Sequence, residues 1–181
     1  MALYAIGDRT PTIHPTAFVH PDAVIIGDVT VGAEASIWPT AVLRGDSGRV
    51  LVGDQTSIQD GSVLHCTEEL DTVVGARCVI GHRVHLEGCI IEDDSLVGSG
   101  SVVLHGAIVR SGALVAAQAL VSPGCHLAVC CNGACAVARR QNRHSHRRCP
   151  WRPASWPPSS VDLVDGEAPL PACIVRQCRH R

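Results

Sequence analysis

Aliphatic residues recur at every sixth position along the first two thirds of the chain. The register runs from Ile13 to Leu43, resumes at Val52 after a nine-residue step and at Val74 after a ten-residue step, and continues from Ile91 after a five-residue step. A period of six suits neither an amphipathic helix nor a plain alternating strand. It predicts short strands joined by tight turns, with the aliphatic side chain inward. The positions, all Ile, Val or Leu, are Ile13, Val19, Ile25, Val31, Ile37, Leu43, Val52, Ile58, Leu64, Val74, Ile80, Leu86, Ile91, Val97, Val103, Val109, Val115 and Val121.

Three such six-residue units would close one triangular coil, and successive coils would stack about 4.8 Å apart through strand pairing. The sequence therefore predicts an all-β fold, a parallel β-helix of about six coils over residues 1–124. A β-sandwich of short strands is the alternative, but a sandwich has no reason to keep a period of six. The nine- and ten-residue steps, which contain "GDSGR" and "CTEELDT", are expected to bulge from corners as loops.

Counting the units in threes places polar residues on particular faces. His65 and Glu87 each follow an inward aliphatic residue on the same face, one coil apart, and Arg44 holds the equivalent place one coil earlier. Their side chains should stack at about the strand spacing, within reach of one metal ion. His82 falls on the adjacent face, so a neighbouring subunit would have to present it. The register therefore predicts a split site and an oligomer of cyclic symmetry.

Four segments, "AVLRGDSG", "SIQDGSVLHC", "VIGHRVHLEGC" and "LVGSGSVVL", follow one another in the order and spacing of a known family. Over residues of about 10–124 the chain resembles the gamma-class carbonic anhydrases of the hexapeptide-repeat superfamily. The resemblance implies a left-handed β-helix, although the general rule for crossovers favours the right hand. It also implies a homotrimer that hydrates carbon dioxide to bicarbonate through metal-bound hydroxide at each subunit interface.

The resemblance assigns roles to individual residues. His65 in "QDGSVLH" matches the first zinc ligand, and His82 in "GH" matches the second. Arg44 and Asp46 match an "RGD" whose Arg and Asp pair at the trimer contact. A glutamine beside the metal-bound water corresponds to Gln59, and its acidic neighbour to Asp60.

The third histidine of the family is replaced here by Glu87. Two histidines and a glutamate still form a recognised catalytic zinc set, and iron or cobalt could take the place of zinc. A carboxylate ligand should lower the pKa of bound water less than an imidazole does. His85 is the alternative third ligand. The resemblance implies a glutamate proton shuttle directly after "RGD", but the residue at that position is Ser47. Glu68 and Glu69 are therefore candidate replacements. A zinc-dependent lyase of the carbonate dehydratase type is therefore expected.

Two other functions compete with the hydratase. Hexapeptide acyltransferases share the solenoid and use an interface histidine as general base, a role that His105 could fill one coil beyond Glu87. The other alternative is a metal-binding homologue with little or no hydrase activity. Metal content, carbon dioxide hydration and acetyl-coenzyme A turnover separate these possibilities.

The sequence predicts neither a membrane span nor a signal peptide. Aromatic residues make up 3% of the chain, so the core must be aliphatic, as in a stacked repeat. No segment approaches the roughly 18 consecutive apolar residues of a membrane span, and the start lacks the pattern of a signal peptide. We expect a cytoplasmic protein with reduced cysteines, without membrane or nucleic-acid partners.

Residues 125–181 differ from the body. They hold nine of the fifteen Arg but only three of the seventeen acidic residues, and the chain has no Lys. Two explanations of this composition are a zinc knuckle, for which the spacing is poor, and a basic arm that binds nucleic acid. We favour a third, a frameshift, because Asn132–Val137 can be encoded so that a one-base shift gives Met-Val-Pro-Ala-Arg, similar to the "GVPAR" that closes the β-helix in the family. We expect this tail to be poorly ordered, and the trimer to be weaker for lack of the family's closing helix.

Overall fold

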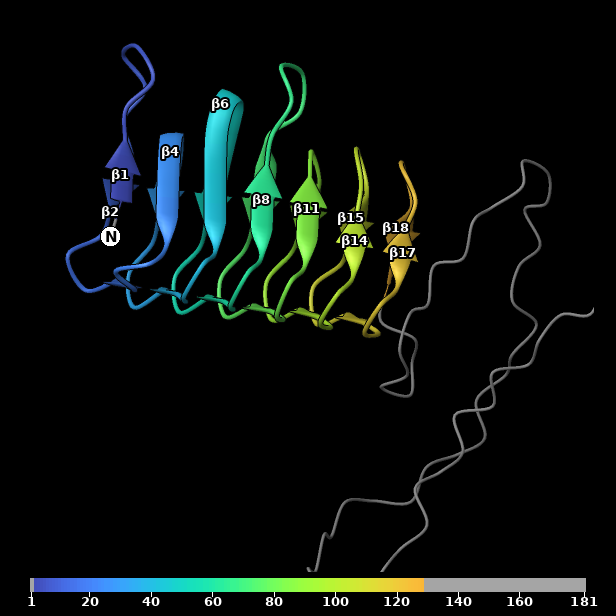
Figure 1. The fold of residues 1–181 in the computed structure, drawn as a ribbon. Coiled ribbons are helices and arrows are strands. Elements are labelled where there is room, and N and C mark those ends of the chain that lie inside the picture. The colour runs from blue at the N-terminus through green and yellow to red at the C-terminus, as the bar shows by residue number, and fades with distance from the viewer. Residues whose placement is uncertain (1, 129–181) are drawn as a thin grey trace, which may run out of the picture. The chain divides into compact units, whose positions relative to one another are not determined.

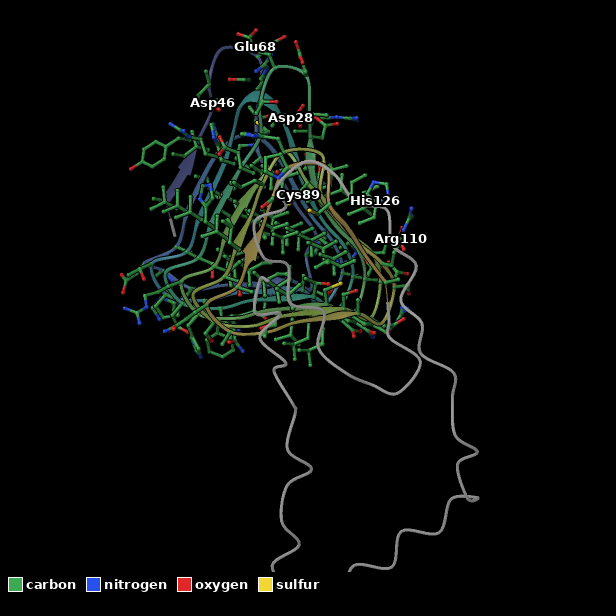
Figure 2. The ribbon with its side chains drawn as sticks, turned by 90° about the vertical axis from the view of Figure 1, so that its right-hand side faces the viewer. Asp28, Asp46, Glu68, Cys89, Arg110 and His126 are labelled. Carbon is green, nitrogen blue, oxygen red and sulfur yellow. The ribbon has the colours of Figure 1, made fainter. Side chains whose placement is uncertain are left out.

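The computed structural model describes residues 2–128. These residues form a left-handed parallel β-helix of about seven turns, one more than the period predicts. The coils stack side by side in chain order, and two loops project from the same edge (Figure 1). Viewed along the stack, the coils have a triangular outline (Figure 2). Among residues 2–128 there is no helix, so none that could cross a membrane. The predicted tail begins at residue 125 and lies almost entirely outside the described residues.

Face 1 is a six-stranded parallel sheet. Its strands are two residues long, and each ends on an inward aliphatic residue. They are β3 (Phe18–Val19), β5 (Ser36–Ile37), β7 (Ser57–Ile58), β10 (Val79–Ile80), β13 (Leu96–Val97) and β16 (Leu114–Val115).

Faces 2 and 3 are joined because two strands, β4 (Val24–Val31) and β6 (Val42–Val52), run through the corner between them. Face 2 contains the first part of both strands together with β1 (Ala2–Tyr4), β8 (Val63–His65), β11 (His85–Glu87), β14 (Val102–Val103) and β17 (Leu120–Val121). Face 3 contains their second part together with β2 (Thr12–Ile13), β9 (Thr72–Val74), β12 (Ile90–Ile91), β15 (Ile108–Val109) and β18 (His126–Leu127).

The predicted register is confirmed along the core. Leu43, Leu64, Leu86 and Val103 are paired in sequence on face 2, as Ile37, Ile58, Ile80 and Val97 are on face 1. All the predicted inward positions are buried except Ile13 and Val19 of the first coil, which are partly buried against the same core. Leu127 continues the six-residue spacing into β18, beyond Gly124. Burial of these aliphatic side chains is the main driving force for the stack.

A second column of buried residues lies two positions before each aliphatic residue. Its members are small, chiefly Ala, Ser, Thr and Cys, and they include the thiols of Cys78 and Cys89. Burial raises the pKa of both thiols, that of Cys89 to about 12. Small side chains suit these positions because the chain has turned the corner directly before them, and the interior is narrow there. Three of the four cysteines in residues 2–128, Cys66 as well as Cys78 and Cys89, are core residues.

All three irregular steps fall at the corner between faces 2 and 3. The nine-residue step was expected to form a loop, but its residues belong to β6, which extends through the corner opposite a register shift in β4. The backbones approach closely there, since a Cβ on Gly45 would lie 2.2 Å from the carbonyl oxygen of Asp28. The ten-residue step does form a loop, between β8 and β9, whose base is held by a paired Arg49 and Asp71.

Candidate active site

A column of polar side chains runs along the outside of face 2. Arg44, His65 and Glu87 are paired residue by residue on β6, β8 and β11. Each follows an inward leucine, so strand alternation turns its side chain outward. The prediction that His65 and Glu87 stack one coil apart is confirmed, with His65 Nδ1 3.1 Å from Glu87 Oε1.

Glu87 is the centre of this column because three imidazoles surround its carboxylate. His65 contacts one oxygen, while His85 Nε2 and His105 Nε2 lie 3.3 Å and 3.5 Å from the other. His85 and Glu87 both point outward from β11, on either side of the buried Leu86. The two residues considered as alternative third ligands therefore belong to one cluster.

The second ring nitrogen of His65 faces β6. Asp46 Oδ1 lies 2.9 Å and Arg44 Nη2 3.0 Å from His65 Nε2, and Arg44 Nε lies 3.4 Å from Asp46 Oδ2. The Arg44–Asp46 pair that the resemblance places at a trimer contact thus forms within a single chain. Asp46 is held further by Arg9, whose guanidinium donates to its main-chain carbonyl. As a result, His65 has a carboxylate at each ring nitrogen.

Both carboxylates of the cluster stay ionised to lower pH than usual. Burial acts to raise the pKa of Asp46, but the hydrogen bond from His65 and the positive charge of Arg44 outweigh it and lower the pKa. Burial also acts to raise the pKa of Glu87, and the hydrogen bonds from His85 and His65 reverse the effect. The cluster therefore contains two anions beside three imidazoles, an arrangement suited to holding protons or a cation.

Sequence reasoning missed one member of this region, Cys66. It is fully buried next to His65 at the start of the loop, two positions after an inward leucine instead of two before. Its Sγ, His65 and Asp46 have donor atoms within 4.8 Å of one another. Cys66 follows its inward aliphatic residue, whereas Cys78 and Cys89 precede theirs. This difference in position is the sequence signal that could have revealed Cys66.

The remaining predicted site residues lie elsewhere. His82 and Asp60 occupy successive turns between faces 1 and 2, not a flat face, and His82 Nδ1 lies 3.0 Å from Asp60 Oδ2. More than half of the His82 side chain, 56%, is exposed. Gln59 follows β7 on face 1. Within residues 2–128 none of these three contacts the Glu87 cluster, so a site completed by His82 of another copy stays a prediction.

An apolar groove of about 300 Å³ lies at the corner beside the cluster. The loop after β8 forms one wall, and β12 and β15 form the floor. His105 is at its edge, because its Cδ2 lies 3.3 Å from where a Cβ on Gly88, a lining residue, would be. Of the candidate proton shuttles, Glu69 lines the groove and Glu68 is exposed near the loop tip (Figure 2). The full lining is Glu69, Leu70, Asp71, Val73, Gly88, Ile90, Gly106, Ala107 and Ile108.

Comparison with known proteins places this arrangement in a family. The family model for the bacterial transferase hexapeptide (six repeats) matches residues 10–45 and 71–105. A crystal structure of a hexapeptide transferase family protein from Anaplasma phagocytophilum is 39% identical, with a TM-score of 0.67 over 69% of this chain and 74% of that one. The chain belongs to the hexapeptide-repeat family. A Bacillus cereus protein provisionally named an acetyltransferase is 36% identical, with a TM-score of 0.69 over 70% of this chain and 73% of its own.

Among curated hexapeptide-repeat relatives, the carnitine operon protein CaiE of Escherichia coli O157:H7 is 52% identical over 98 residues. That match covers 54% of this chain and 50% of CaiE, so the chain spans about half the length of the curated relatives it matches. These comparisons support the expected superfamily and do not single out the carbonic anhydrases within it.

Proposed function

We propose that the protein transfers an acyl group from a thioester donor to an amine or hydroxyl acceptor, with the Glu87 cluster as its reaction centre. The observation that carries the proposal is the pairing of His105 with Glu87 at the edge of an apolar groove. The transferase description of the family and the provisional name of the Bacillus cereus relative support it.

His105 has the properties of a general base. Its Nε2 faces Glu87, and its side chain is 44% exposed, so Nδ1 can accept a proton from an incoming acceptor. The acceptor's heteroatom then bonds to the thioester carbonyl carbon, the carbon–sulfur bond breaks, and the leaving thiolate takes the proton back from the imidazolium. The Glu87 carboxylate orients the ring and stabilises its charged form. The apolar groove offers a surface for the acyl group.

Turnover of acetyl-coenzyme A and longer acyl-coenzyme A thioesters, followed by loss of thioester absorbance, tests this proposal. His105→Gln should reduce kcat/KM by about 10²–10⁴-fold, the usual contribution of a general base. His14→Gln is the matched control, since His14 is exposed in the first coil and, among the described residues, its side chain hydrogen-bonds only to Thr16. Equal turnover by the wild type and His105→Gln would exclude His105 as the base.

A second candidate is metal-dependent hydration of carbon dioxide, favoured by the stacked His65 and Glu87. Two ligands of a tetrahedral zinc ion lie roughly 3.3 Å apart at normal zinc–ligand distances, and His65 Nδ1 and Glu87 Oε1 are separated by 3.1 Å. The pair therefore fits two ligand positions, and His82 of a second copy in a homotrimer would supply the third. Zinc bound there would supply Lewis-acid activation of water.

Stopped-flow hydration of carbon dioxide by the zinc-loaded protein tests this second candidate. His82→Ala should abolish the activity while leaving the fold intact, because within residues 2–128 the His82 side chain hydrogen-bonds only to Asp60. Activity that survives His82→Ala would contradict the split site. Sedimentation of the same samples shows whether the homotrimer forms.

A further inference from the structure

Three metal-ligating atoms of different chemistry converge where β6 passes the end of β8. They are a carboxylate oxygen of Asp46, a ring nitrogen of His65 and the sulfur of Cys66, all within 4.8 Å of one another. A tetrahedral zinc ion needs its sulfur ligand roughly 3.6 Å from each nitrogen or oxygen ligand. Side-chain rotations that move these atoms by about 1 Å would therefore close the site.

The sulfur of Cys66 contacts polar main-chain atoms of β6. The main-chain N–H of Gly48 donates to its Sγ at 3.1 Å, and the carbonyl oxygen of Arg44 lies 3.6 Å away. The N–H bond from Gly48 is an outer contact of the kind that orients metal ligands, and a bound metal ion would replace the S–H proton that the Arg44 carbonyl accepts. Cys89 is buried in the same core as Cys66, and desolvation raises the pKa of its thiol to about 12.

His65 is oriented for coordination through Nε2. When Nδ1 carries the proton and donates it to Glu87 Oε1 at 3.1 Å, an unprotonated Nε2 directs its lone pair at Asp46 Oδ1, 2.9 Å away. A proton on Nε2 satisfies that contact as a hydrogen bond to Asp46, and a metal ion can take the place of that proton. Metal-bound histidines almost always donate their other N–H to a carboxylate or carbonyl. Arg44, whose Nη2 is 3.0 Å from Nε2, is about half exposed and can swing away.

We propose that Asp46, His65 and Cys66 of a single chain bind one zinc-type divalent cation, and that Glu87 positions His65 without touching the ion. Sulfur, nitrogen and oxygen donors together select zinc or cobalt over magnesium or calcium. This site needs no residue from another copy, uses the opposite ring nitrogen of His65 from the split site, and does not depend on acyl transfer.

Titration with cobalt(II), followed by absorbance, tests the ligand set, because a cobalt–thiolate bond gives an intense near-ultraviolet charge-transfer band. The full-length chain is used, with the six cysteines that follow Cys125 changed to serine so that the band reports on residues 2–128. We expect one cobalt per chain with this band. It should vanish in Cys66→Ala and persist in Cys89→Ala, a matched loss of a buried thiol. The six are Cys130, Cys131, Cys135, Cys149, Cys173 and Cys178.

Two surface variants complete the test where loss of a buried thiol could affect folding. Asp46→Asn should weaken cobalt binding at least tenfold, because it removes a ligand. Glu87→Gln should weaken it by about 10–100-fold, as expected of an outer-shell carboxylate, while the band remains. Cobalt binding without the band, a band lost equally in Cys89→Ala, or no binding at millimolar cobalt would each overturn the proposal.

Discussion

The coils of residues 43–91 and those of residues 96–121 share one core but differ at one corner. Both sets keep the inward aliphatic column buried and in register. The later coils advance in steps of six, whereas the earlier coils take steps of nine, ten and five, always between faces 2 and 3. Asp46, Cys66 and the loop wall of the groove all lie in those irregular steps. The regular spacing builds the solenoid and carries His105, and the irregular steps add Asp46, Cys66 and the loop wall of the groove.

The largest expected effect concerns the close backbone contact at the irregular corner. Gly45→Ala should destabilise the fold by several kcal/mol, on the order of 4, because its Cβ would lie 2.2 Å from the carbonyl oxygen of Asp28. Gly106→Ala, at the same corner of a regular coil, meets nothing closer than 3.9 Å. Its cost should be about 1–2 kcal/mol, from its positive φ alone. Chemical denaturation measures both, and equal costs would show that the two corners do not differ in backbone packing.

A second change converts an irregular coil into a regular one. Deleting residues 67–70 shortens the ten-residue step to six. The far-ultraviolet circular dichroism should keep its strand signature, since the core columns are untouched. Thioester turnover should fall at least tenfold, because Glu69 and Leu70 are lost from the groove wall. Inserting four residues after Gly106 is the control and should be tolerated in the fold. Loss of the fold in the deletion variant would mean that the loop is structural.

The smallest effect is a pH dependence at the base of this loop. Burial acts to raise the pKa of Asp71, but hydrogen bonds from the Arg49 side chain and main chain outweigh it, so the folded pKa is lowered. The carboxylate therefore stabilises the fold above its unfolded pKa, and that contribution is lost as the pH falls through the folded pKa. The stability difference between wild type and Asp71→Asn should be largest near neutral pH and vanish in acid.

Asp94 is the comparison for Asp71. It pairs with Arg77, which lies in a regular six-residue step. Hydrogen bonds from Arg77 lower its pKa as well, but half of its side chain is exposed, so solvent screens the pair. Asp94→Asn should show the weaker pH dependence in the same denaturation series. A stronger dependence for Asp94 would show that the loop base is not specially anchored.

The sequence allowed the fold and part of the site to be predicted, for a physical reason. Spacing along the chain determines which residues are inward and which coils are neighbours, so the stacking of Arg44, His65 and Glu87 followed from counting. Counting could not show that β6 continues through the corner or that His105 reaches Glu87. Those contacts depend on side-chain reach and on the path of the irregular steps. The residues that would share a metal ion with His82 lie in a second copy of the chain, and the spacing within one chain does not show how two copies meet.

The most direct test is the thioester turnover of Glu87→Gln, because three imidazoles, the proposed base His105 among them, lie at that carboxylate. Asp93→Asn, an exposed acidic residue paired with Arg77, is the control. We predict that Glu87→Gln lowers kcat/KM at least tenfold while the protein stays folded at the assay temperature, and that Asp93→Asn has wild-type turnover. Wild-type turnover by a folded Glu87→Gln protein would contradict this prediction.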